Sequence, residues 1–166
     1  MKTIFSFEVF PQKKTMPIDT IYNTLDELKD LHPDFISVTF GAGGSENCDN
    51  AVGIAKRIKD VCNVKSVIHM PCLNMTKNDA TFVLEEFQKA GIENILALRG
   101  DKVEGKEPAN EFLHAEDLIK FIKDFDSKRT DGKSFNIFGA CYPELHPESK
   151  SVYDDIDFLK RKVDAG

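Results

Sequence analysis

The sequence lacks most of the features that mark a secreted, metal-binding or membrane protein. Its four cysteines are scattered, with no C-x-x-C pair and no grouping with histidine of the kind that binds zinc. Scattered cysteines are typical of reduced thiols in a cytosolic protein. No apolar run approaches the length that crosses a bilayer, and the residues after Lys2 alternate in polarity instead of forming the apolar core of a signal peptide. These absences predict a cytoplasmic protein without a metal site or a membrane segment.

Acidic residues outnumber basic ones, 28 to 22. The 166 residues carry a net charge of −6, which argues against a nucleic acid or an anionic membrane as the partner. A hydrophobic fraction of 41% in a chain of this length is enough for the core of one domain. No linker or low-complexity segment divides the chain. We therefore expect a single domain over residues 1–166.

Short apolar segments alternate along the chain with segments of helical periodicity. The alternation and the β-branched or aromatic content predict strands at residues 4–10, 35–40, 65–72, 94–98 and 135–142. The spacing of apolar residues predicts helices at residues 19–31, 49–61, 76–90, 115–122 and 152–163. Strict β-α alternation of this kind builds a parallel sheet with helical crossovers.

Local signals fix the ends of two of these helices. Asp49 is the expected N-cap of the second helix. Thr76 and Asp79 resemble a capping box at the start of the third helix, and Gly91 is expected to end it.

Spacing alone does not distinguish a doubly wound sheet from a (β/α)8 barrel. No G-x-G-x-x-G follows the first strand, so the dinucleotide-binding Rossmann fold loses its main support. Polar residues at or just after the strand ends favour the barrel, because parallel strands bring them to the rim where barrel enzymes have their active sites. These residues are Glu8, Thr39, His69, Arg99, Asp101, Tyr142, Glu144 and His146.

Several of these residues have a plainer structural interpretation. Arg99 and Asp101, which follow the apolar run 94–98, could simply pair with each other. The glycine-rich loop 41–45 could cradle a phosphate or form a tight turn. Glu8 alternates with Phe7 and Val9, which places it on the inner face of the barrel, where burial would raise its pKa and suit it to acid catalysis.

Five segments, spread in order from one end of the chain to the other, resemble the methylenetetrahydrofolate reductase family of flavoprotein (β/α)8 barrels. They are FSFEVFP (5–11), SVTFGA (37–42), GIENILALRGD (91–101), YPELHPE (142–148) and LKRKVDAG (159–166). The resemblance implies a (β/α)8 TIM barrel, of which this chain carries about the first five β/α units. It also implies reduction of 5,10-methylenetetrahydrofolate to 5-methyltetrahydrofolate, with FAD as the cofactor and NADH or NADPH as the hydride donor.

The resemblance further implies residue roles. Glu8 matches the general acid that protonates the folate, and Asp101 matches a catalytic aspartate close to both the flavin and the folate. Thr39 matches a residue near the nicotinamide. The positions that line FAD correspond to Thr39, Phe40, Ala42, His69, Arg99, Gly100, Asp101, Ala115, Tyr142, His146, Ser149, Asp155, Arg161 and Lys162, with Phe158 at a further position where the family has a polar residue.

The family continues beyond the last residue of this sequence, into a sixth strand that bears a substrate-binding glutamine and two further β/α units. We therefore expect this chain to be a piece of a longer reductase. The exposed edges of its first and fifth strands predict self-association, weak FAD retention and little folate turnover when it is alone, with a partner subunit left open. Two alternatives are an accessory flavin-binding module without catalysis, and an unrelated barrel lyase or aldolase that uses Lys65 or Lys102 as a Schiff-base amine.

Overall fold

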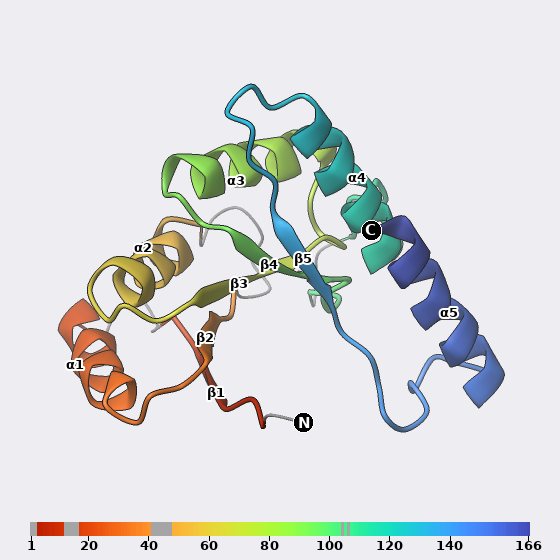
Figure 1. Cartoon of the computed structure of the whole chain (residues 1–166). Coiled ribbons are helices and arrows are strands. Elements are labelled where there is room, and N and C mark those ends of the chain that lie inside the picture. Colours follow the sequence, from red (N-terminus) through yellow and green to blue (C-terminus); the bar gives the residue numbers. More distant parts are fainter. Residues whose placement is uncertain (1–2, 12–16, 41–47, 104, 106) are drawn as a thin grey trace.

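The computed structural model describes residues 3–11, 17–40, 48–103, 105 and 107–166 (Figure 1). Strands and helices alternate along the chain as predicted. The strands are β1 (Ser6–Val9), β2 (Phe35–Val38), β3 (Ser66–Pro71), β4 (Asn94–Leu98) and β5 (Asn136–Gly139). The helices are α1 (Ile18–Lys29), α2 (Cys48–Asp60), α3 (Lys77–Lys89), α4 (Ala115–Ser127) and α5 (Val152–Ala165).

The strands form one parallel sheet whose spatial order, β1-β2-β3-β4-β5, is the order of the sequence. Each crossover adds the next strand at the same edge, and α1 to α4 follow one another along one side of the sheet (Figure 1). A doubly wound sheet would reverse its strand order partway and carry helices on both faces. The observed order is that of a barrel wall, so the fold is a partial (β/α)8 barrel of five units.

The two faces of the sheet have different surroundings. Val9 is in register with Val38, and Ile68 with Ile95, and all four side chains are buried against the helices. The residues that alternate with them lie on the opposite, inner face of the wall. There Glu8 is in register with Ser37, and His69 with Leu96. The core therefore lies between the sheet and its helices, and the predicted polar groups lie on the other side.

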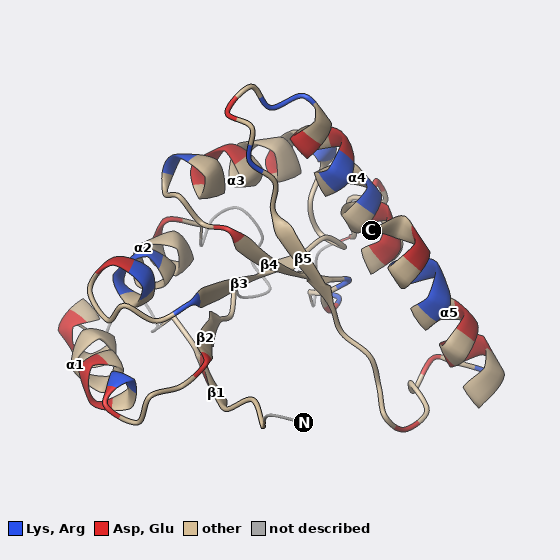
Figure 2. Ribbon diagram, viewed as in Figure 1, with Lys and Arg blue, Asp and Glu red and all other residues tan. Residues whose placement is uncertain are grey.

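Charged residues follow the same division. Figure 2 shows Lys, Arg, Asp and Glu concentrated on the helices and the connecting loops, while the strands are almost free of them. Within the described residues, no helix has the length and apolar character needed to cross a bilayer. The described part of the chain also contains no cluster of His, Cys, Asp and Glu that could hold a metal ion. Burial raises the pKa of the Cys72 thiol to about 12 and that of Cys48 to about 11, as expected for unreactive core thiols.

The capping signals were mostly correct. Thr76 and Asp79 form the predicted capping box of α3, in which each side chain accepts a hydrogen bond from the other residue's backbone N–H. Gly91 follows α3 with φ of +66°, a left-handed conformation typical of a residue just beyond a helix end. The prediction that Asp49 is the N-cap was wrong, because α2 (Cys48–Asp60) already includes Asp49 in its first turn. In the first turn its carboxylate still interacts favourably with the positive end of the helix dipole.

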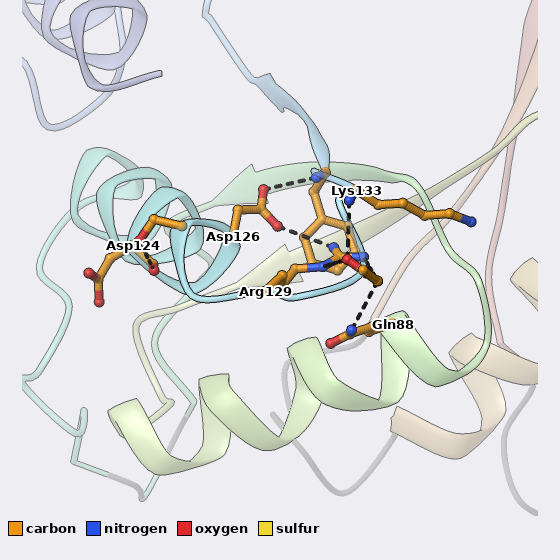
Figure 3. Close-up of polar contacts among 8 residues, drawn as sticks. Gln88, Asp124, Asp126, Arg129 and Lys133 are labelled. Atoms are coloured by element: carbon orange, nitrogen blue, oxygen red, sulfur yellow. Dashed lines mark hydrogen bonds and ion pairs between the residues drawn. The ribbon is translucent and has the colours of Figure 1, made fainter.

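A buried arginine organises the turn between α4 and β5 (Figure 3). The side chain of Arg129 is only 7% exposed and forms ion pairs with Asp126 at 3.2 Å and Asp131 at 2.7 Å. Its guanidinium carbon lies 4.7 Å from the centroid of the Phe135 ring. We call Asp126, Arg129, Asp131 and Phe135 the amino-end cluster, because it lies where β5 begins.

Hydrogen bonds tie this cluster to the elements around it. Asp126 accepts a hydrogen bond from the backbone N–H of Phe135 at 2.9 Å, which joins α4 to the start of β5. Asp131 accepts one from the side-chain amide of Gln88 on α3 at 3.0 Å and one from the backbone N–H of Lys133 at 3.1 Å (Figure 3). The cluster therefore fixes two helices and one strand relative to one another.

Candidate functional site at the carboxyl ends of the strands

A cleft of about 710 Å³ opens beside the carboxyl ends of β4 and β5. Its walls are the end of β4, the start of α4, the segment between β5 and α5, and one side of α5. Parallel strands bring these segments together although they are distant in sequence. Most of the predicted cofactor positions line this cleft: Arg99, Gly100, Asp101, Ala115, Tyr142, His146, Ser149, Asp155, Arg161 and Lys162, together with Phe158.

Arg99, at the end of β4, binds a partner that the sequence analysis did not assign. Its two terminal nitrogens lie 2.6 and 3.0 Å from the two carboxylate oxygens of Glu148. This bidentate pair raises the pKa of Arg99 and lowers that of Glu148, in each case mainly through the hydrogen bonds between them. The alternative pairing with Asp101 is not the one formed. The pair fastens the segment before α5 to the tip of β4.

Asp101 lies exposed on the rim of the cleft. Its backbone carbonyl accepts a hydrogen bond from the side-chain amide of Asn74 at 2.9 Å, which links the loop after β4 to the loop after β3. Between the two charged residues, Gly100 has φ of +80°. A Cβ atom at this position would lie 2.7 Å from the Cβ of Pro71, so both the backbone angle and the available space require glycine.

The segment before α5 is shaped by one carboxylate. Asp155 accepts a hydrogen bond from the backbone N–H of His146 at 2.7 Å and another from the hydroxyl of Ser149. Both bonds lower the pKa of Asp155, and the bond from His146 has the larger effect. The ring of Tyr142 packs edge-on against that of His146, with 4.6 Å between centroids. Asp155, predicted as a cofactor-lining residue, therefore also holds two other such residues in place.

Two cations of α5 face the cleft. The ammonium of Lys162 donates a hydrogen bond to the carbonyl of Ala140 at 2.5 Å. Arg161 lies 3.2 Å from the carboxylate of Glu116 at the start of α4, and its guanidinium covers the ring of Phe158 at 4.6 Å. Phe158 accordingly takes part in a cation–π contact, an arrangement that positions Arg161 next to the cleft.

The rest of the cleft wall on α5 is apolar. Val152, Ile156 and Leu159 lie at helical spacing and are 57%, 56% and 39% exposed. None of the residues of α5, a helix described in full, is buried, and its main neighbour is α4. The helix therefore presents both its apolar stripe and its two cations to the cleft.

Glu8 and His69 form a second group, on the inner face of the sheet and outside the lining of this cleft. Their closest atoms, Oε2 of Glu8 and Nε2 of His69, are 3.4 Å apart. The side chain of Glu8 is 49% exposed and that of His69 is 10% exposed. Glu8 thus lies on the predicted face, and it is partly uncovered, as expected for a wall of five strands. The full enclosure needed to desolvate its carboxyl is not present.

The remaining predicted positions are dispersed. Thr39 is partly buried beyond the end of β2, and the side chain of Phe40 is in the core with its ring centroid 6.1 Å from that of Phe87. Any cofactor contact from Phe40 would therefore come from its backbone. Ala42 and the loop 41–45 lie outside the described residues. Lys65, the candidate Schiff-base lysine before β3, is at the amino end of its strand, on the opposite edge from the cleft.

The geometry defines a class of protein: part of a parallel β/α barrel with a cleft at the carboxyl ends of its strands, where barrel enzymes have their active sites. The chain belongs to the methylenetetrahydrofolate reductase family, because it matches the family described as "Methylenetetrahydrofolate reductase" over residues 1–166. It is therefore a member of an enzyme family of folate one-carbon metabolism.

Individual relatives support the same family assignment. The chain is 37% identical to the "5,10-methylenetetrahydrofolate reductase" of Escherichia coli (strain K12) over 161 residues, which is 97% of this chain and 51% of the relative. It is 36% identical to "Methylenetetrahydrofolate reductase (NADH) 1" of Arabidopsis thaliana over 178 residues, 99% of this chain and 29% of the relative. The chain thus spans about half the length of the bacterial relative and less than a third of the plant relative.

Proposed function

We propose that this chain contributes the FAD-binding rim and the general acid of a reductase that converts 5,10-methylenetetrahydrofolate to 5-methyltetrahydrofolate with NADH or NADPH. The observation that carries this proposal is the gathering of most of the predicted cofactor positions around a single cleft. Those positions were chosen from the sequence alone, and they come from four separate segments of the chain. The names of the two relatives support the choice of substrate.

The cleft suits FAD in size and in chemistry. Its volume of about 710 Å³ lies in the range of roughly 300–1,000 Å³ that is typical of small-molecule sites. The apolar stripe of α5 can cover a flat ring system, while Arg161 and Lys162 supply the positive charge that a diphosphate requires. FAD, when bound, would supply a ring system that accepts a hydride and passes it to the folate.

The residues of the chain have separate tasks in this proposal. Glu8 holds a proton for a nitrogen of the folate, the task of a general acid. Asp101 presents a carboxylate on the rim between the cofactor and the substrate. Glu148 and Asp155 act indirectly, because they hold Arg99, His146 and Ser149 in place.

Titration of the purified chain with FAD, followed by quenching of flavin fluorescence, tests the proposed cleft. We expect Lys162→Met to weaken FAD binding about tenfold, since it removes a charge-assisted contact. Lys160→Met is the matched control, because Lys160 is exposed on the same helix and does not line the cleft. Equal affinities for the two variants, with unchanged thermal unfolding, would contradict the proposed cleft.

A second candidate function is FAD binding without catalysis by the isolated chain. The half exposure of Glu8 favours it, because an acid open to solvent exchanges its proton with water. We also propose that the exposed edges of β1 and β5 lead the chain to self-associate or to pair with a partner subunit. Light scattering and a folate turnover assay on the FAD-loaded chain separate these cases. A monomer with full reductase activity would rule out the second candidate.

A further inference from the structure

Glu116 is an acidic residue in the wall of the cleft, and the sequence analysis gave it no role. It lies in the first turn of α4, and its side chain is 15% exposed. A carboxylate in this wall would repel a diphosphate unless cations compensate its charge. The position of Glu116 next to Arg161, in a cleft suited to an anion, therefore needs an explanation.

Two cations compensate the charge of Glu116, one at each of its carboxylate oxygens. Nζ of Lys120, one turn further along α4, lies 3.7 Å from Oε1. Nε of Arg161, on α5, lies 3.2 Å from Oε2. Arg161 lines the cleft, whereas Lys120 lies outside its lining. The carboxylate thus joins a cation of its own helix to a cation of the neighbouring helix that faces the cleft.

The start of α4 also holds Arg161 through aromatic rings. The guanidinium carbon of Arg161 lies 4.6 Å from the centroid of the Phe158 ring. That ring stacks on the imidazole of His114, the residue before α4, with 6.2 Å between centroids and 22° between planes. Arg161 is therefore held by a carboxylate and by a ring, although its side chain is 51% exposed. Its closest approach to Glu116 is made by Nε, and its terminal nitrogens donate no hydrogen bond to a described residue.

We propose that Glu116 is a positioning residue for Arg161, whose guanidinium it orients for the diphosphate of FAD. This inference rests on the proposed function, which places FAD in the cleft. An exposed arginine loses side-chain freedom when it binds a phosphate, and this loss weakens binding. An arginine that is already held has lost part of that freedom before the ligand arrives. Because Lys120 shares the charge of Glu116, this gain exceeds the repulsion between the carboxylate and the diphosphate.

The hold on Arg161 can be measured without a cofactor, from the ¹⁵N relaxation of its Nε–H group. Glu116→Gln keeps the shape of the side chain and removes its charge, so we expect a lower order parameter for that group. Lys120→Met is the matched control, because it removes the other cation of the same carboxylate and should leave the order parameter unchanged. An unchanged order parameter in Glu116→Gln would overturn the inference, whether or not the chain binds FAD.

A double-mutant cycle with FAD tests the consequence for binding. Glu116→Gln should weaken FAD binding about fivefold, the loss expected when the ligand itself must immobilise one long side chain. In the Arg161→Met background the same change should have no effect, because the side chain that Glu116 holds is gone. A merely structural role of Glu116 would give equal losses in both backgrounds and would overturn the inference. Tighter FAD binding in Glu116→Gln would overturn it as well.

These outcomes are separate from that of the proposed function. A wild-type chain that does not bind FAD would contradict the proposed function, while a lower order parameter in Glu116→Gln would still support the hold of Glu116 on Arg161. FAD binding by the wild type, together with equal losses in the two backgrounds, would contradict only the positioning role of Glu116.

Discussion

Two arginines, one at each end of the sheet, make similar bonds in very different surroundings. Arg129, at the amino end of β5, is 7% exposed, pairs with two aspartates and lies over an aromatic ring. Arg99, at the carboxyl end of β4, is 31% exposed and pairs with a glutamate that is itself 62% exposed. Arg129 is enclosed by the surrounding protein, whereas the pair of Arg99 and Glu148 is open to solvent. In barrel proteins the amino ends stabilise the fold and the carboxyl ends carry the chemistry.

The largest effect is expected at the amino-end cluster. Arg129→Met should lower the free energy of unfolding by about 3 kcal/mol, because it leaves the carboxylate of Asp126, whose side chain is 7% exposed, without its cation. Urea unfolding followed by circular dichroism measures this loss. Lys128→Met is the control, since its ion pair with Asp124 is 71% and 59% exposed and should contribute less than about 1 kcal/mol. Equal losses in the two variants would remove the distinction between a buried and a surface pair.

The pH dependence of stability should be centred on the same cluster. The hydrogen bond from Arg129 is the main reason that the pKa of Asp131 lies below its ordinary value of 3.8. A lowered carboxyl pKa favours the folded state above the unfolded value, and the contribution is lost as the pH falls from there through the folded pKa. Asp131→Asn should therefore be less stable than the wild type at pH 6, and the difference should narrow below pH 3.8.

Urea midpoints measured over a pH series test this sign. Asp155→Asn provides the comparison from the other end of the sheet, because the pKa of Asp155 is also lowered, chiefly by the backbone N–H of His146. The urea midpoint of Asp155→Asn should also depend on pH, and this variant should bind FAD more weakly than the wild type. Asp131→Asn should bind FAD as the wild type does. If the difference in urea midpoint between the wild type and Asp131→Asn stays constant with pH, the charge of the Asp131 carboxylate does not contribute to stability.

The smallest change in stability is expected at the carboxyl end. Glu148→Gln removes one charge from a pair that water reaches from both sides, so its urea midpoint should match that of the wild type within error. Its effect should appear instead in susceptibility of the segment before α5 to proteolysis, because the Arg99 anchor of that segment is weakened. A loss of stability as large as that of Arg129→Met would mean that the two ends of the sheet do not differ as described.

The sequence predicted the fold better than it predicted the contacts. All ten elements were located from hydrophobic periodicity and capping residues, since those signals are local. The gathering of Arg99, Tyr142 and Lys162 also followed, because it depends only on parallel strands and on the family resemblance. The choice between a doubly wound sheet and a barrel required the order of the strands in the sheet, which no local sequence pattern encodes.

The pairing of charged side chains could not be read from the sequence. Arg99 bonds to Glu148, 49 residues away, in preference to Asp101, two residues away. Arg129 and Asp131 occur in a charged, glycine-containing turn that resembles any solvated loop, and nothing in their spacing indicates burial. The first pair depends on how the end of β4 and the segment before α5 are placed, and the second on the packing of α4 against β5. Their partners become identifiable only when the elements are placed in three dimensions.

Gly100 affects how a mutational screen of this chain should be interpreted. Every other amino acid at this position would combine a strained backbone angle with a clash against Pro71. A library scored for activity or growth will therefore reject all substitutions there, whether or not a ligand ever touches the residue. Intolerance at Gly100 carries no information about cofactor contact, whereas intolerance at Asp101, an exposed residue on the rim of the cleft, does.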